Sequence, residues 1–177
     1  MTVSKRTFLI FWIGGLVIFA GSLVLHAPLA IEAVPGGILD HQGAPHAVAV
    51  DAIQRAWRDA GLLETAKTAM ISDLVFIGIY GLGAALGGLY FRASGRALGK
   101  DGLTGLGVAI LAAGVVFLVT DYAETITQLI QLTRFAGNDA MAGFASSMGV
   151  PKALSFLFSF FAVPVALVWE WRAGKAA

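Results

Sequence analysis

Four long apolar segments constrain this chain more than any other feature of its sequence. They cover residues 8–28, 70–91, 103–124 and 153–171, and each is close to the ~20 residues that an α-helix needs to cross the hydrocarbon core of a bilayer. Only 13% of the residues are charged, against roughly 25% in a soluble domain. The sequence therefore predicts an all-α fold, an integral membrane four-helix bundle, with residues 1–177 forming a single four-span membrane domain.

The connection between the first two spans contains a helix of a different kind. Its first half is rich in turn-forming Gly and Pro residues, whereas residues 47–68 place Ile53 and Trp57 on one helical face and charged residues on the other. Such an amphipathic helix lies on the membrane surface or caps the bundle. We therefore expect an extra amphipathic helix in the first outer loop, which Gly61 can divide into two pieces.

The distribution of basic residues predicts the orientation of the chain. One side of the predicted bundle carries two acidic residues and seven basic ones, namely Lys5, Arg6, Arg92, Arg96, Lys100, Arg172 and Lys175. The opposite side carries five basic and six acidic residues. Because cytoplasmic loops are enriched in Lys and Arg, the sequence predicts a multi-pass protein of the bacterial inner (cytoplasmic) membrane with both termini in the cytoplasm. The first apolar run is longer than a signal-peptide core, so we expect an uncleaved first span.

Composition limits the partners of this chain. The formal net charge of +1 gives no basis for a nucleic-acid partner, and the sequence contains no cysteine for disulfides, thiol catalysis or thiolate metal sites. The lipid bilayer is therefore the first expected partner. Gly83 and Gly87 form a small-xxx-small pair on the second span, and we expect this face to pack against Gly107 and Gly114 of the third span. The same glycine-rich helix faces can alternatively contact another membrane protein.

A row of polar residues interrupts the third apolar segment and its continuation. Asp121, Glu124, Thr125 and Gln128 are spaced i, i+3, i+4 and i+7, so at 100° per residue they share one face of a helix. Acidic side chains in or beside a membrane span are energetically unfavourable, and they usually face the protein interior and mark a functional site. This row is the main functional signal in the sequence.

An acidic residue from the second span is predicted to meet this row. Asp73 opens that span, where it shares a helical face with Tyr80. The short connection after residue 92 makes the second and third spans antiparallel neighbours, and at ~1.5 Å per residue Asp73 and Asp121 reach a similar depth. We therefore expect Asp73, Asp121 and Glu124 to converge in an outward-opening acidic pocket, with Tyr80 and Gln128 extending its polar lining. The structural alternative is that these acids cap helix ends and fix helix packing.

Three carboxylates in such a pocket need a cation, or some of them must bind protons. The candidate cations are a basic side chain, a metal or a basic ligand. The candidate metal ligands are His26, His41 and His46, since His with carboxylates can bind zinc, copper or iron. However, the chain lacks HxxxH and ExxH spacing on a single helix. The sequence therefore favours solvated loop and interface histidines over a metal site, and it assigns no cofactor and no catalytic residue.

Three short motifs resemble those of a family of small bacterial four-transmembrane-helix proteins. The motifs are Pro35-Gly36-Gly37-Ile38, then Asp73-Leu74-Val75-Phe76 with Tyr80, and Asp121-Tyr122-Ala123-Glu124. The resemblance runs from His26 to Gly88 and more weakly to Gln128. In that family the third span commonly carries D-x-x-E-N, whereas Thr125 follows Glu124 here. The resemblance implies the topology and the choice of acids, and it implies no particular activity.

Two classes of function fit these features. In the first, the chain is a membrane protein whose acidic pocket binds a small molecule, a lipid or a cation, with or without catalysis. In the second, it is a non-catalytic accessory or assembly subunit of a larger membrane complex. A coupled transporter is less favoured, because the sequence shows neither internal repeats nor paired broken helices.

Overall fold

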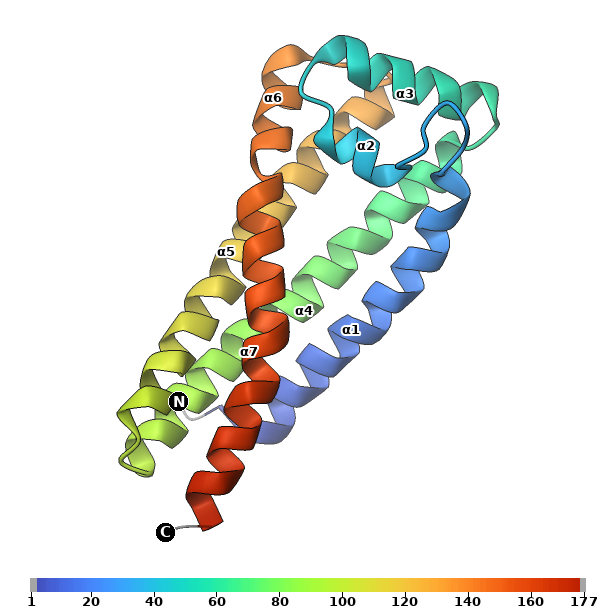
Figure 1. Ribbon diagram of the computed structural model, residues 1–177. Coiled ribbons are helices and arrows are strands. Elements are labelled where there is room, and N and C mark those ends of the chain that lie inside the picture. Colours follow the sequence, from blue (N-terminus) through green and yellow to red (C-terminus); the bar gives the residue numbers. More distant parts are fainter. Residues whose placement is uncertain (1–2, 176–177) are drawn as a thin grey trace. The chain divides into compact units, whose positions relative to one another are not determined.

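The computed structural model describes residues 3–175, and almost all of this range is helical (Figure 1). The elements in order are α1 (Lys5–His26), the short 3-10 helix η1 (Ala27–Leu29), α2 (Ile38–Gly43), α3 (Ala47–Asp59), α4 (Leu63–Ala97), α5 (Asp101–Arg134), α6 (Asp139–Ser147) and α7 (Gly149–Lys175). Four helices, α1, α4, α5 and α7, are long and apolar enough to cross a membrane. The predicted all-α fold with four spans and an additional amphipathic helix is therefore confirmed, and the chain is a multi-pass membrane protein.

The long helices extend beyond the apolar segments that identify them. α4 begins at Leu63, and α5 continues to Arg134. The helix expected over residues 47–68 ends at Asp59, because Gly61 adopts a positive φ of 72°. Gly61 N–H donates to the carbonyl of Arg58, and Leu62 N–H donates to that of Trp57 at 2.7 Å, which is the hydrogen-bond pattern of a Schellman C-cap. Residues 63–68 consequently form the first turns of α4.

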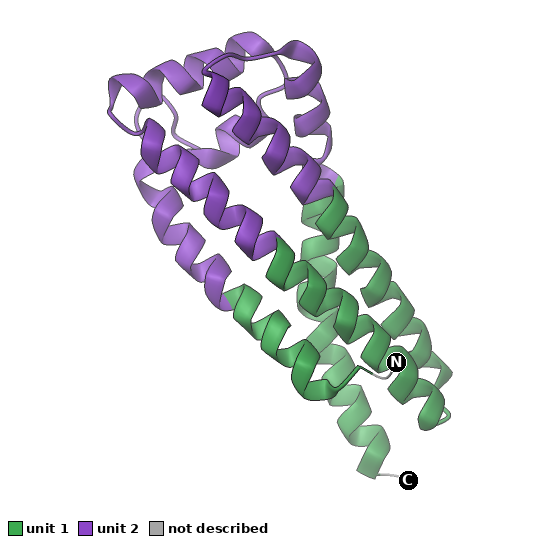
Figure 2. Ribbon diagram, turned by 180° about the vertical axis from the view of Figure 1, so that it is seen from behind, with its two compact units in different colours: residues 1–16, 78–119, 151–177 green, residues 17–77, 120–150 purple. Residues whose placement is uncertain are grey.

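Contacts between Cα atoms divide the chain into two compact units (Figure 2). Unit 1 contains Met1–Leu16, Gly78–Val119 and Pro151–Ala177, and unit 2 contains Val17–Ile77 and Thr120–Val150. α1, α4 and α5 each contribute residues to both units. Unit 1 holds the α4–α5 connection and most of α7, and unit 2 holds the short helices together with the predicted acidic residues.

Close packing in unit 1 depends on glycine, but with a different partner from the one predicted. A Cβ atom on Gly83 would collide with the backbone of Trp12 in α1, and one on Gly87 would press against the ring of Phe8. The small-xxx-small pair therefore lies against α1. The expectation that this pair faces the third span is wrong, because it is the next glycine along α4, Gly88, that contacts the third span.

The α4–α5 contact of unit 1 is made by a different set of small residues. A Cβ atom on Gly88 would collide with the backbone of Leu111, and one on Gly114 would collide with Ala85. Gly107 lies equally close to the backbone of Arg92. Because a glycine at these crossing points lets two helix backbones approach closely, α4 carries two glycine faces, one for α1 and one for α5.

A single carboxylate links three helices of unit 1. Glu170 of α7 is buried, and its Oε2 lies 2.6 Å from Lys5 Nζ of α1. Its Oε1 accepts hydrogen bonds from Tyr90 OH and, at 2.8 Å, from Ser94 Oγ, both in α4. A buried carboxylate is tolerated when it is paired and fully hydrogen-bonded, and these three donors satisfy Glu170.

In unit 2 the short helices α2, α3 and α6 pack against one another at the ends of the long helices (Figure 1). Their core includes Leu29, Ile38, Trp57, Ala66, Ala69, Met70 and Leu132. Trp57 is fully buried, and its indole Nε1 donates to the carbonyl of Leu29 at 3.0 Å. The N–H groups of Ala47 and Gly137 bond to Asp139 and Asp51 at 2.7 and 2.6 Å. The short helices are thus held by apolar packing and by backbone-to-carboxylate hydrogen bonds.

Candidate functional site

The polar row of α5 faces the interior of unit 2. The exposed fractions of Asp121, Glu124, Thr125 and Gln128 are 6%, 0%, 1% and 2%, whereas Ile126 between them is 45% exposed. Thr125 Oγ1 donates to Asp121 Oδ1 at 3.4 Å, and Gln128 Nε2 donates to Glu124 Oε1 at 3.5 Å. The helical periodicity in the sequence therefore corresponds to one continuous buried polar face, which we call the α5 polar row.

Asp73 is paired with the histidine that ends α1. His26 Nε2 lies 3.1 Å from both carboxylate oxygens of Asp73, and the two side chains are 18% and 9% exposed. The hydroxyls of Ser22, one turn before His26 in α1, and Ser72, directly before Asp73 in α4, are 3.1 Å apart. The α1 and α4 segments of unit 2 are thus joined by two polar contacts, and His26 gives Asp73 a hydrogen-bond donor of its own.

The α4 and α5 segments that carry the acids are neighbours within unit 2. Tyr122 OH donates to the carbonyl of Leu74 at 3.0 Å. Tyr122 follows Asp121 directly, and Leu74 follows Asp73. The antiparallel arrangement expected from the short α4–α5 connection therefore brings the two acidic positions to the same level of the helix pair.

The short helix α2, which follows η1 in the chain, contacts the α5 polar row. Gln128 Nε2 also donates to the main-chain carbonyl of Gln42, at 3.2 Å. The preceding residue, His41, is 1% exposed and stacks on Trp57 with ring centroids 5.4 Å apart. The expectation of a solvated loop histidine is wrong for His41, because residues 38–43 form a helix that turns the imidazole onto the indole of α3. His46, in contrast, is exposed.

Gln54 of α3 completes the polar contacts and is a residue that the sequence analysis missed. Its side chain is fully buried, and its Nε2 lies 3.3 Å from His41 Nε2. The sequence contains a signal for it, since Val50, Gln54 and Trp57 are spaced i, i+4 and i+7 and a polar residue within an apolar helical stripe is unusual. All three are buried in the structure.

Gln54, Gln128 and His41 each present one buried polar atom that has no hydrogen-bond partner within the described part of the chain. These atoms, which we call the open polar atoms, are Gln54 Oε1, Gln128 Oε1 and His41 Nδ1. Burial lowers the pKa of His41 to about 4, so its imidazole is neutral at pH 7. Because the amide nitrogen of Gln54 donates to His41 Nε2, the imidazole proton lies on Nδ1. The open polar atoms are therefore two acceptors and one donor.

Tyr80, predicted to extend the polar lining, belongs to unit 1. It is fully buried, and its hydroxyl lies 2.9 Å from Ser159 Oγ and 3.3 Å from the carbonyl of Phe156. Its ring packs against Phe117 and Phe156 with centroids 5.3 and 4.9 Å apart. Of the predicted site residues, Asp121, Glu124 and Gln128 lie in the α5 polar row, and Asp73 lies on the neighbouring segment of α4, where His26 contacts it. His41 and Gln54 contact each other, and Gln42, the residue after His41, contacts Gln128.

The histidines and carboxylates do not form a preformed metal centre. Among residues 3–175, no three His, Asp or Glu side chains are arranged to hold a metal ion. His26 contacts Asp73, and His41 contacts Gln54 instead of a carboxylate. What the arrangement offers chemically is a set of buried carboxylates beside amide oxygens, which suits a ligand that carries several hydrogen-bond donors.

Comparison of the chain with protein-family models, with curated proteins and with solved structures finds no match.

Proposed function

We propose that unit 2 contains a binding site for a small organic cation, in which an ammonium or guanidinium group donates hydrogen bonds to Gln128 of the α5 polar row and to Gln54 of α3. The observation that carries this proposal is the pair of buried acceptors, Gln54 Oε1 and Gln128 Oε1, without a partner among the described residues. A buried acceptor left unsatisfied costs about 1–3 kcal/mol. A ligand with several N–H donors satisfies both oxygens and gains that free energy.

The neighbouring charges favour a cation over a neutral ligand. Gln128 contacts the carboxylate of Glu124, so a donor group that reaches Gln128 Oε1 also lies close to this acid. Hydrogen bonds between an ionised donor and a carboxylate are roughly twice as strong as neutral ones. The Nδ1–H of His41 adds a donor that suits a hydroxyl or carbonyl on the same ligand, which argues for an organic cation over a bare metal ion.

The inferred orientation places this site on the outer side of a bacterial inner membrane. Seven basic residues accompany the two termini and the α4–α5 connection, and this distribution supports cytoplasmic termini. Because the chain contains no cysteine, single-cysteine variants give a clean labelling assay in intact cells. A membrane-impermeant maleimide should label Ala140→Cys in α6 and leave Ala97→Cys at the end of α4 unlabelled until the cells are opened. Labelling of Ala97→Cys from outside would reverse the orientation.

Ligand-dependent thermal stabilisation tests the binding site. The purified full-length protein would be heated in detergent with methylguanidine, ethanolamine or putrescine, with NaCl at equal ionic strength as the reference. A ligand at a hundredfold excess over its Kd stabilises the folded state by about 2.7 kcal/mol. We expect at least one of these cations to raise the Tm of the wild type.

Two matched variants separate binding from stability. Gln128 and Gln131 are both buried glutamines of α5, but Gln131 Oε1 accepts a hydrogen bond from the backbone of Asn138, and its atom without a partner among the described residues is the donor Nε2, not an acceptor. Gln128→Leu should abolish the Tm shift with the cations, and Gln131→Leu should keep it despite a lower basal Tm. Equal shifts in both variants, or no shift with any cation in the wild type, would contradict the proposal. Native mass spectrometry of the same preparations distinguishes the accessory-subunit alternative, which requires a co-purifying polypeptide.

A further inference from the structure

Unit 1 contains a surface pocket that the proposed cation site does not use. It has a volume of about 570 Å³ and is lined by Lys100, Val165, Val168, Trp169, Arg172 and Ala173. Two of these residues are basic, one is an indole and the remaining three are apolar. The pocket lies where the α4–α5 turn meets the last turns of α7.

The turn that carries Lys100 is held rigidly. α4 ends in a C-cap in which Gly99 has a φ of 61° and Lys100 N–H donates to the carbonyl of Gly95 at 2.8 Å. The carbonyl of Lys100 then accepts from Thr104 N–H in α5 at 3.0 Å. The backbone of Lys100 is therefore fixed by both helices, and its side chain is exposed.

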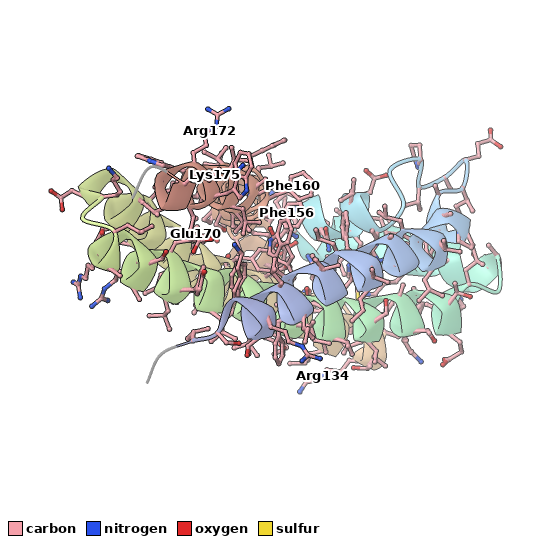
Figure 3. All side chains as sticks on the ribbon, turned by 90° about the horizontal axis from the view of Figure 1, so that it is seen from below. Arg134, Phe156, Phe160, Glu170, Arg172 and Lys175 are labelled. Carbon is pink, nitrogen blue, oxygen red and sulfur yellow. The ribbon has the colours of Figure 1, made fainter. Side chains whose placement is uncertain are left out.

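The opposite wall of the pocket comes from α7. The Trp169 ring lies against Gly102 in the first turn of α5, where a Cβ atom would collide with it. Arg172 follows one turn later, and it extends away from the helices (Figure 3). Contact with Gly102 orients the indole, although 40% of Trp169 remains exposed. The pocket thus combines an aromatic wall with a cation on each side.

Both cations are available to an external anion. Among residues 3–175, Lys5, Arg58 and Lys67 each pair with a carboxylate, whereas neither Lys100 nor Arg172 takes part in an ion pair. The nearby Lys175, in contrast, already has a partner, because its Nζ lies 3.9 Å from the centroid of the Trp171 ring. Asp101 is the neighbouring carboxylate in the sequence, and it is exposed.

An exposed apolar strip on α7 adjoins the pocket and precedes Arg172 in the sequence. Phe161, Val165 and Val168 are spaced i, i+4 and i+7 along α7, and their exposed fractions are 63%, 57% and 51%. Trp169 and Arg172 continue the same helix. The order along α7 is therefore apolar strip, indole and cation, which matches the acyl chains, interfacial region and headgroup of a phospholipid.

We propose that this pocket binds one anionic phospholipid, with its headgroup phosphate between Lys100 and Arg172 and an acyl chain along the Phe161–Val165–Val168 strip. Arg presents a fork of donors that matches phosphate geometry, and Lys adds a compact point charge. The indole of Trp169 lies between the charged and apolar parts, where aromatic residues are favoured at membrane interfaces. The adjoining apolar strip selects a lipid over a free phosphate ion.

Lipid titration followed by native mass spectrometry tests this pocket in the full-length protein. The probes are dioleoyl-phosphatidylglycerol and dioleoyl-phosphatidylcholine, which have the same acyl chains and differ in net charge. The pocket variant is Lys100→Ser with Arg172→Gln, and the control is Arg96→Gln with Lys175→Gln, which removes the same charge from the same end of unit 1. Each Lys or Arg near an anionic headgroup contributes about a 5-fold gain in affinity, so the pocket variant should bind phosphatidylglycerol about 25-fold more weakly.

The expected pattern is specific to one lipid and one pair of residues. The wild type and the control pair should bind phosphatidylglycerol equally well and more tightly than phosphatidylcholine. If the control pair binds phosphatidylglycerol as weakly as the pocket variant does, the attraction is general and does not depend on this pocket. If the wild type binds phosphatidylcholine as tightly as phosphatidylglycerol, the headgroup charge does not contribute to binding and the proposal is wrong. If inorganic phosphate alone displaces phosphatidylglycerol at matched ionic strength, the ligand is a phosphate ion and the lipid proposal fails. Should the double variant not fold, Arg172→Gln alone provides the same comparison with an effect of about 5-fold.

Discussion

His26 Nε2 lies 3.1 Å from each of the two carboxylate oxygens of Asp73, so the end of α1 and the acidic turn of α4 share one polar contact. Asp73→Ala leaves the imidazole of His26 without this partner in a largely buried position. We expect a loss of about 1–3 kcal/mol in the free energy of unfolding. The control is Asp59→Ala, which removes an exposed partner of Arg58 and should cost less than about 1 kcal/mol. Denaturant unfolding in mixed micelles measures both, and equal losses would show that the His26–Asp73 contact contributes little.

The buried imidazole of His41 predicts a pH dependence of stability. Its pKa is about 4 in the folded protein, against 6.5 for an unperturbed histidine in the unfolded chain. The unfolded state therefore binds more protons between these two values, so stability is fully present above pH 6.5 and is lost as the pH falls towards 4. The loss from this group is about 3 kcal/mol.

Two histidine variants isolate this contribution. His41→Gln removes the group that titrates, so stability should fall less steeply between pH 6.5 and pH 4 than in the wild type. His46→Gln removes an exposed histidine of the same connection and should keep the wild-type slope. Thermal unfolding at several pH values measures the slopes, and identical slopes in the two variants would mean that His41 titrates normally.

The packing of α4 on α1 predicts that a single methyl group at Gly83 is destabilising. In Gly83→Ala the new Cβ atom would collide with the backbone of Trp12, and a backbone cannot move away as a side chain can. Overpacking of this kind costs about 1–3 kcal/mol. Gly21→Ala in α1 is the control, because nothing lies within 4 Å of its Cβ position, and it should leave the Tm unchanged or raise it. A wild-type Tm for Gly83→Ala would show that α1 and α4 separate readily.

The shared carboxylate of unit 1 predicts that charge, and not only shape, matters at position 170. Glu170→Gln keeps the size of the side chain but replaces one acceptor oxygen by a donor facing Lys5, Tyr90 or Ser94. Hydrogen bonds to charged groups contribute about 1.5–3 kcal/mol, so the Tm should fall clearly. Glu64→Gln is the matched control, because its carboxylate is 84% exposed and pairs with Lys67 on the same helix. A Tm unchanged in both variants would contradict this account of Glu170.

Local sequence patterns were sufficient for much of the fold. The lengths of the four apolar segments identified the four long helices, because spanning a bilayer requires about 20 apolar residues in a row. The i, i+3, i+4, i+7 spacing of Asp121, Glu124, Thr125 and Gln128 identified one face of α5, because helical geometry alone places these residues together. Both properties depend on residues that are close in the sequence. The role of these side chains in binding a ligand stays a prediction.

Only the tertiary structure decided which helix each face meets. The glycine spacing on α4 indicated close packing, but Gly83 and Gly87 are equally compatible with α1 and with α5, since a small residue favours any close neighbour. The same holds for His41, whose burial depends on stacking against Trp57 in α3, and for Gln54, whose partner is the imidazole of α2. Periodicity determines which residues share a surface, whereas the contact of that surface with another segment depends on the packing of the whole chain.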